Sequence, residues 1–298
     1  MASPSTLNRS LELAGTLPAL MVAADRVAAT VIQGVHGRRR VGQGDAFWQY
    51  RPYRDGDSAS QIDWRQSARS RNLFVRETEW EAAASVWLWR DASPSMQYAS
   101  LRNLDTKAVR AEVITLALAS LLTDAAERVA VLGTGMRPIT GRIAVRRIAE
   151  TLFDETREGS RQPPSLPPMV PLPAHGTVVL VSDWLDPLEK IEDIIRYYAS
   201  VGVRGHLVQV LDPAEEDLPF DGHVKFEGLE AEGQHTIRRV ETVRTAYGAR
   251  LAAQREGLQR LARPANWTVH LHRTDRPAQT VLLSLYLAMA DLRRLSVG

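Results

Sequence analysis

Apolar and polar positions follow two different rhythms from about residue 83 to the end of the chain. Short, almost continuous apolar runs are separated by longer stretches in which apolar residues return every three or four positions. The runs are typical of strands covered on both faces, and the longer stretches are typical of helices. The expected strands are 84–89, 128–133, 177–182, 206–211 and 267–272; the expected helices are 106–122, 141–153, 187–199, 240–262 and 278–294; and 223–239 is an expected hairpin.

Strands that alternate with helices in this way predict an α/β fold, with a mostly parallel sheet and helices on both faces. We assign this domain, with its C-terminal hairpin and helix additions, to residues 83–298. Residues 1–30 are expected to form an N-terminal helix. Residues 31–82 are dense in glycine, arginine and aromatic residues and contain short alternating runs, which predict a small β-rich module.

Composition narrows the possible functions. With 44% hydrophobic and 24% charged residues, the 298-residue chain has the mix of an ordinary soluble globular protein. Its net charge of only +2 argues against a general polyanion binder, so we expect no nucleic-acid partner. Cysteine is absent, which excludes disulfides, thiolate metal sites and cysteine nucleophiles. We expect no membrane span and a cytoplasmic location.

Oxygen-bearing side chains follow two of the expected strands. Asp91, Ser93 and Ser95 come directly after the first strand, and Asp183 comes directly after the third. Ligands of open parallel sheets bind beyond the carboxyl ends of the strands, where strand order reverses. Thr140 is at the expected start of a helix, so its hydroxyl is a further candidate. An all-oxygen set suits a hard divalent cation, Mg²⁺ first and Mn²⁺ or Ca²⁺ as alternatives.

The same residue types also have an ordinary structural use. Aspartate and serine after a strand are common in turns and at helix N-caps, where they bind no ligand. A second aspartate at a second strand end favours the ligand interpretation for Asp91 and Asp183. For Thr140, an N-cap role and a ligand role remain equally open.

Asp91, Ser93 and Ser95, in the order D-x-S-x-S after an apolar strand, resemble the metal-ion-dependent adhesion site of von Willebrand factor A domains. In that family this loop, a downstream threonine and a later aspartate hold a divalent ion. The segment 181–183, Val-Ser-Asp, resembles the later aspartate loop. The resemblance implies the von Willebrand factor A-like, Rossmann-like fold and a metal set that includes Thr140.

Residues 34–81 resemble the signature of the domain-of-unknown-function family fifty-eight (DUF58). The matching motifs are Arg51-Pro52-Tyr53-Arg54-Asp55-Gly56-Asp57, Ile62-Asp63-Trp64, Ser67-Ala68-Arg69 and Val75-Arg76-Glu77. This resemblance implies that the protein works with AAA+ ATPases of the MoxR type in folding, assembling or activating client proteins. It implies no catalytic activity of the family's own.

We therefore expect a non-catalytic interaction module whose metal ion accepts a carboxylate from a partner protein. Two alternatives remain: a metal-dependent hydrolase or phosphatase that uses Asp91, and a metal-free structural scaffold. The enzyme alternative lacks a second acid at position 93, a G-x-S-x-G elbow and a phosphate-binding loop.

Overall fold

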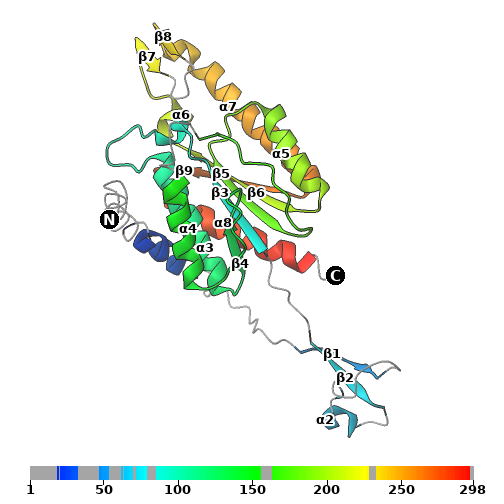
Figure 1. The fold of residues 1–298 in the computed structure, drawn as a ribbon. Coiled ribbons are helices and arrows are strands. Elements are labelled where there is room, and N and C mark those ends of the chain that lie inside the picture. Colours follow the sequence, from blue (N-terminus) through cyan, green and yellow to red (C-terminus); the bar gives the residue numbers. More distant parts are fainter. Residues whose placement is uncertain are drawn as a thin grey trace. The chain divides into compact units, whose positions relative to one another are not determined.

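The computed structural model of the chain (Figure 1) forms two compact units, one of residues 1–35 and 84–298 and the other of residues 36–83. It describes residues 19, 21–32, 47–53, 62, 64–69, 72–78, 85–155, 163–227 and 233–295. Several motif residues of the DUF58 signature, including Asp57 and Asp63, lie outside the described residues.

The larger unit contains a helix over residues 21–32 and the α/β elements that the sequence pattern predicted. These are β3 (Ser85–Arg90), η2 (Pro94–Gln97), α3 (Lys107–Asp124), β4 (Arg128–Val131), α4 (Arg142–Glu155), β5 (Thr177–Ser182), α5 (Leu188–Ser200), β6 (Arg204–Leu211), α6 (Pro213–Asp217), β7 (Val224–Glu227), β8 (Gln234–Ile237), α7 (Glu241–Ala262), η3 (Arg263–Ala265), β9 (Thr268–Arg273) and α8 (Ala278–Leu295). Their bounds agree with the predicted strands and long helices to within two residues. The short helices η2, α6 and η3 were not predicted.

Five strands form one sheet in the order β4-β3-β5-β6-β9, and each neighbouring pair is parallel. The chain enters at β3, adds β4 on one side and then returns to add β5 on the other. Strand order therefore reverses between β3 and β5, which places a crevice at their carboxyl ends. The predicted mixed α/β fold with a parallel sheet is confirmed at this level.

Helices cover both faces of this sheet (Figure 1). Val86 and Leu88 of β3 face a core formed with α3, α4, α8 and the helix over residues 21–32. Trp87 and Trp89 face the opposite core, formed with α5 and α7. Helix α3 is buried around most of its circumference, as its nearly continuous apolar sequence requires.

A histidine cluster is buried in the sheet between β6 and β9. His206 shares a hydrogen bond of 2.7 Å with the Thr268 hydroxyl, which also lies 2.8 Å from Nε2 of His270. The other ring nitrogen of His270 lies 2.9 Å from the Ser284 hydroxyl. Burial lowers the pKa of His206 to about 3, with His270 and Arg204 adding to the effect, and lowers that of His270 to about 4.

The smaller unit contains β1 (Phe47–Pro52) and β2 (Phe74–Thr78), which pair antiparallel, and the short helix α2 (Trp64–Ser67). The Ser67 hydroxyl accepts a hydrogen bond of 2.9 Å from the backbone N–H of Phe74, which ties α2 to β2. Among the described residues of both units, none of the helices combines the length and hydropathy that a membrane span requires.

Candidate functional site

Asp91 lies at the carboxyl end of β3 and is completely buried. Its backbone N–H donates to the carbonyl of Val181 in the neighbouring strand at 2.8 Å. One carboxyl oxygen accepts from the backbone N–H of Ser93 at 2.7 Å, and the other accepts from the Ser182 hydroxyl at 2.8 Å. The Asp91 side chain thus joins the loop after β3 to the end of β5.

The loops after β3 and β5 also meet through Ser95. Its hydroxyl donates to Oδ2 of Asp183 at 2.9 Å and lies 3.1 Å from the hydroxyl of Ser93. Pro94 opens the short helix η2 and fixes the backbone ahead of Ser95. The structure therefore brings together four of the five residues that the sequence singled out: Asp91, Ser93, Ser95 and Asp183.

Asp183 is held in place by the residue that follows it. Trp184 has a left-handed backbone (φ of 53°) and is fully buried. Its indole N–H donates to the carbonyl of Val208 at 3.1 Å, and its carbonyl accepts from the Gln254 amide at 2.9 Å. A strained backbone persists where the surroundings fix it in this way, so the direction of Asp183 is set by the packing of Trp184.

Lys107, the first residue of α3, completes the cluster. Its ammonium donates to Oδ2 of Asp183 at 3.0 Å and to Oε1 of Glu215 at 2.6 Å. The residue is fully buried. A cation in the first turn opposes the helix dipole, so its presence there depends on the two carboxylates. The three residues, Lys107, Asp183 and Glu215, form an ion-pair clamp in which Lys107 and Asp183 are buried and the Glu215 side chain is 19% exposed.

Glu215 reaches this position through the capping box of α6. The side chain of Asp212 accepts from the backbone N–H of Ala214 at 2.8 Å, and Oε2 of Glu215 accepts from the backbone N–H of Asp212 at 2.9 Å. The second oxygen of Asp212 accepts from the backbone N–H of Ser100 at 2.9 Å. Both oxygens of Glu215 are engaged, one in the capping box and one with Lys107.

Burial and neighbouring charges act differently on the pKa values of Asp91 and Lys107. Burial raises the pKa of Asp91 to about 7, an effect that the hydrogen bonds from Ser93 and Ser182 reduce but do not cancel. Burial alone would lower the pKa of Lys107, but the carboxylates of Asp183 and Glu215 raise it above its ordinary value. Lys107 is therefore a charged ammonium at neutral pH, whereas the raised pKa of Asp91 brings its titration close to neutral pH.

Thr140 does not join this cluster. Ile139 pairs antiparallel with Val129, near the amino end of β4, and Val129 lies level with Val86 near the start of β3. Thr140 therefore lies near the amino ends of the strands, whereas Asp91 lies at their carboxyl ends, and Thr140 is exposed. The ligand set that the sequence indicated lacks its threonine.

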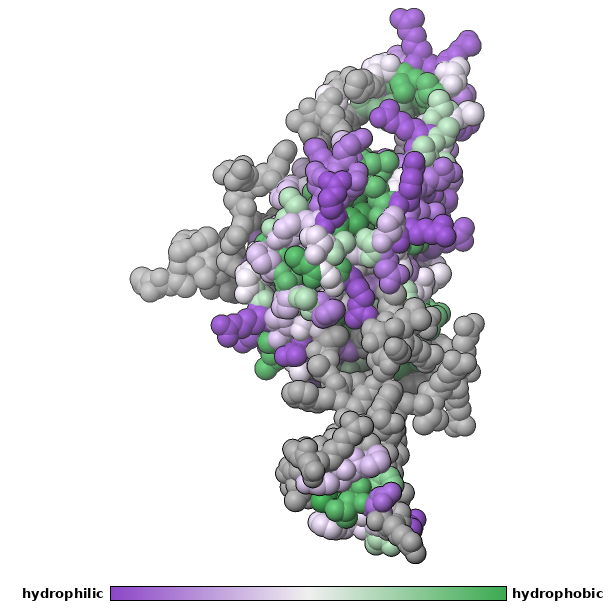
Figure 2. Space-filling model, turned by 90° about the vertical axis from the view of Figure 1, so that its right-hand side faces the viewer, coloured by the Kyte–Doolittle hydropathy of each residue, from purple (hydrophilic) through white to green (hydrophobic). Residues whose placement is uncertain are grey.

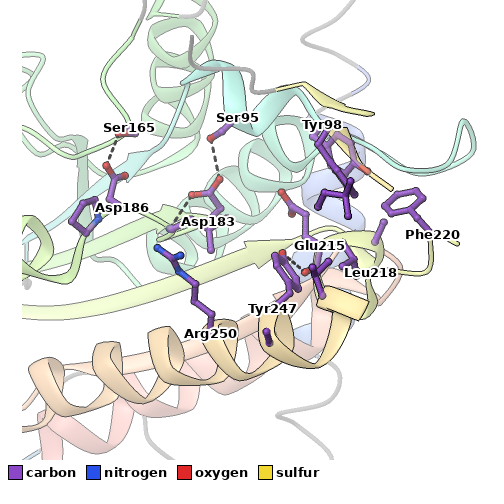
Figure 3. Close-up of a pocket in the computed structure, with 17 residues that line it drawn as sticks. Ser95, Tyr98, Ser165, Asp183, Asp186, Glu215, Leu218, Phe220, Tyr247 and Arg250 are labelled. Atoms are coloured by element: carbon purple, nitrogen blue, oxygen red, sulfur yellow. Dashed lines mark hydrogen bonds between the residues drawn. The ribbon is translucent and has the colours of Figure 1, made fainter. Parts of the chain in front are cut away.

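A pocket of about 690 Å³ opens beside the clamp (Figure 3). Ser95, Asp183 and Glu215 line one side of it. The remaining wall is largely apolar and aromatic and includes Tyr98, Leu185, Leu218, Phe220, Phe226, Ile237, Val243, Ala246 and Tyr247. Arg250 extends from α7 into the same space (Figure 3). A pocket with an apolar wall and a few polar groups is typical of a binding site.

The residues present do not fit a resident divalent cation while Lys107 is in place. Oδ2 of Asp183 already accepts from both Ser95 and Lys107. Asp91 is engaged through both oxygens, and its raised pKa makes it a weaker ligand. Within the described residues, no group of three or more histidine, cysteine or acidic side chains is arranged to hold a metal ion.

Sequence reasoning missed Lys107 and Glu215. A signal for the first exists: the chain has only three lysines, and Lys107 opens an otherwise strongly apolar helix. A charged residue in so buried a helix requires a partner. For Glu215 the signal is the order Asp-Pro-x-Glu over 212–215, which has the spacing of a capping box directly after the expected strand 206–211.

Comparison with known proteins places the chain in a family. The family described as protein of unknown function DUF58 matches residues 49–257, more than half of the chain. The chain belongs to the DUF58 family. Uncharacterized proteins of Mycobacterium tuberculosis and Mycobacterium bovis are each 24% identical to it over 289 residues, covering 92% of this chain and 89% of the relative.

Among solved structures, the chain has a likeness to an aerotolerance-related membrane protein from Bacteroides fragilis. The TM-score is 0.43 at 15% sequence identity, covering 70% of this chain and 99% of that chain. A likeness at this level bears on neither the fold nor the function of the DUF58 chain.

Proposed function

We propose that this DUF58 protein is a non-catalytic protein-interaction module of the von Willebrand factor A type. The observation that carries the proposal is the joining of Asp91, Ser93, Ser95 and Asp183 at the strand-order reversal, beside an open pocket. This is the position at which open α/β sheets bind ligands. The D-x-S-x-S loop and the later aspartate lie together there, as the family resemblance implies.

The enzyme alternative is disfavoured by the state of Asp91. A nucleophilic carboxylate must reach a substrate atom, but Asp91 has no exposed surface and both of its oxygens are engaged. A phosphatase assay with a generic ester checks this point, since a hydrolase that uses Asp91 would show magnesium-dependent turnover that Asp91→Asn abolishes.

The proposed partner is an AAA+ ATPase of the MoxR type, with which the module acts on client proteins in the cytoplasm. The support is the family resemblance together with the shape of the pocket. Its apolar wall and polar floor suit a protein segment that buries a hydrophobic side chain and hydrogen-bonds at its polar end.

The proposal is tested by binding of the full chain to such an ATPase in the presence of ATP. Ala246 lines the pocket and is exposed, so Ala246→Arg fills the pocket entrance without disturbing the core. The matched control is Ala249→Arg, an exposed position on the same helix that does not line the pocket. We expect Ala246→Arg to weaken binding at least about tenfold and Ala249→Arg to leave it unchanged. Equal binding by both variants contradicts the proposal.

A second form of the proposal adds a divalent cation, with magnesium the first candidate and manganese or calcium as alternatives. Ser93, Ser95 and the two aspartates would hold it, and the ion would supply an attraction for a partner carboxylate. What favours it is the convergence of these oxygen donors. It requires Lys107 to leave Asp183 first. Binding to the ATPase with chelator and with magnesium compares the two forms.

A further inference from the structure

The ion-pair clamp contains a positive charge of its own. The ammonium of Lys107 lies within hydrogen-bond distance of Oδ2 of Asp183, the same oxygen that accepts from Ser95. This oxygen belongs to the aspartate that the family resemblance assigns to a metal ion. We propose that Lys107 is the resident cation of this site in place of a divalent metal ion, and that partner contact at the site needs no metal.

Further hydrogen bonds hold the residues of the clamp in place. Lys107 is fixed at its backbone, because its N–H donates to the carbonyl of Tyr98 at 3.1 Å. Thr106 caps the helix ahead of it by accepting from the backbone N–H of Val109 at 3.3 Å. Glu215 is fixed by the capping box of α6. The backbone that carries Lys107 and the side chain of Glu215 are therefore both fixed, which holds the ammonium between Asp183 and Glu215.

Charge balance supports the same conclusion. The side chain of Lys107 is 1% exposed and that of Asp183 is 4% exposed, so neither charge is screened by water. A divalent ion added to the same oxygens would face the ammonium across a poorly screened distance. It would also meet the positive end of α3, which begins at Lys107. The site therefore favours one cation, and the chain itself supplies it.

This inference rests on the proposed interaction site but is tested without any partner. The probe is manganese, whose free concentration is measured by electron paramagnetic resonance in a titration of the full chain. We expect the wild type to bind no manganese at millimolar concentration. We expect Lys107→Met to gain a site that binds at least about tenfold more tightly than anything in the wild type. The reason is that Asp183, Glu215 and the serine hydroxyls then lack a cation.

Two control variants distinguish the gained manganese site from an unspecific effect of removing a buried cation. Arg90→Met also removes a buried cation, one that pairs with Glu112 at 3.2 Å, but no serine hydroxyl bonds to Glu112 among the described residues. It should gain no manganese site. Adding Ser95→Ala to Lys107→Met should abolish the gained site, because the oxygen cluster loses a hydroxyl.

The wild type alone can overturn the inference, even where Lys107→Met fails to fold. Manganese binding below millimolar concentration in the wild type, lost in Asp183→Asn, would show that a metal centre coexists with Lys107. A folded Lys107→Met that gains no site also overturns it. Neither result decides whether the chain binds the ATPase, which the Ala246→Arg comparison tests; manganese binding by the wild type would support the form of the proposed function that adds a divalent cation.

Discussion

Among the polar side chains buried in the described part of the larger unit, two groups keep opposite charge states. At the carboxyl ends of β3 and β5, Lys107 remains charged because Asp183 and Glu215 face it. Between β6 and β9, His206 and His270 face hydroxyls and each other, and burial keeps them neutral. Lys107 and His206 are buried to a similar depth. For Lys107, two facing carboxylates outweigh the effect of burial on its pKa, whereas no carboxylate offsets burial at His206 and His270.

The largest effect is expected from removing the charged group of the first cluster. Lys107→Met leaves the carboxylates of Asp183 and Glu215 without their partner. We expect the free energy of unfolding to fall by about 3–5 kcal/mol, as for one broken half of a buried ion pair. Urea unfolding of the full chain without added metal measures it. The control Lys190→Met removes an exposed lysine and should change stability by less than about 0.5 kcal/mol. A similar result for both variants would mean that Lys107 is not buried in solution.

The second effect concerns the neutral cluster and appears as a pH dependence. The pKa of His206 is about 3 in the folded chain against an ordinary value of 6.5, so the unfolded chain binds more protons between these values. The free energy of unfolding therefore rises with pH across this window. The contribution of neutral His206 to it is fully present above pH 6.5 and is lost on acidification.

The variant His206→Gln removes this titration. Between pH 7 and pH 4, the titration of His206 should lower the free energy of unfolding of the wild type by about 3 kcal/mol. The variant should lack this loss. Thermal melts of both proteins at pH 4 and pH 7 measure the difference between them, which cancels the shared contribution of the carboxylates. Parallel loss of stability in the two proteins would show that His206 is already accessible to protons in the native state.

The smallest effect is expected at a charge pair that water screens. Arg196 contacts Glu192 on the surface of α5, where the two side chains are 65% and 45% exposed. We expect Glu192→Gln to reduce the free energy of unfolding by no more than about 0.5 kcal/mol, and less at high salt. Urea unfolding at low and high salt checks it. A loss comparable to that of Lys107→Met would remove the distinction between buried and exposed pairs.

The sheet and its long helices could be predicted because apolar periodicity reflects burial directly. β5 is apolar along almost its whole length because it is covered on both faces, and α3 is apolar around its axis because it lies inside a core. The proximity of Asp91 and Asp183 could be predicted too, because the carboxyl ends of adjacent parallel strands lie side by side. Membership of the DUF58 family, inferred from motifs between residues 34 and 81, is confirmed.

The rest of the site depends on contacts that carry no periodic signal. Lys107 and Glu215 lie 108 positions apart, and they meet because α3 and α6 follow β3 and β6 of the same parallel sheet. Thr140 was predicted to lie near the carboxyl ends of the strands. It lies near their amino ends because the segment before it turns back beside β4, as the pairing of Ile139 with Val129 shows. A turn of this kind depends on local backbone geometry, which the hydrophobic pattern does not record.

The span between Lys107 and Glu215 has a consequence for how the protein is made. A ribosome must release α6 before the ammonium has both of its carboxylates, so more than two thirds of the chain is synthesised before the clamp can close. A truncated product that ends before β6 carries Lys107 with neither α6 nor the strand that holds Trp184 in place. The closed clamp therefore marks a nascent chain whose sheet has been assembled past its fourth strand.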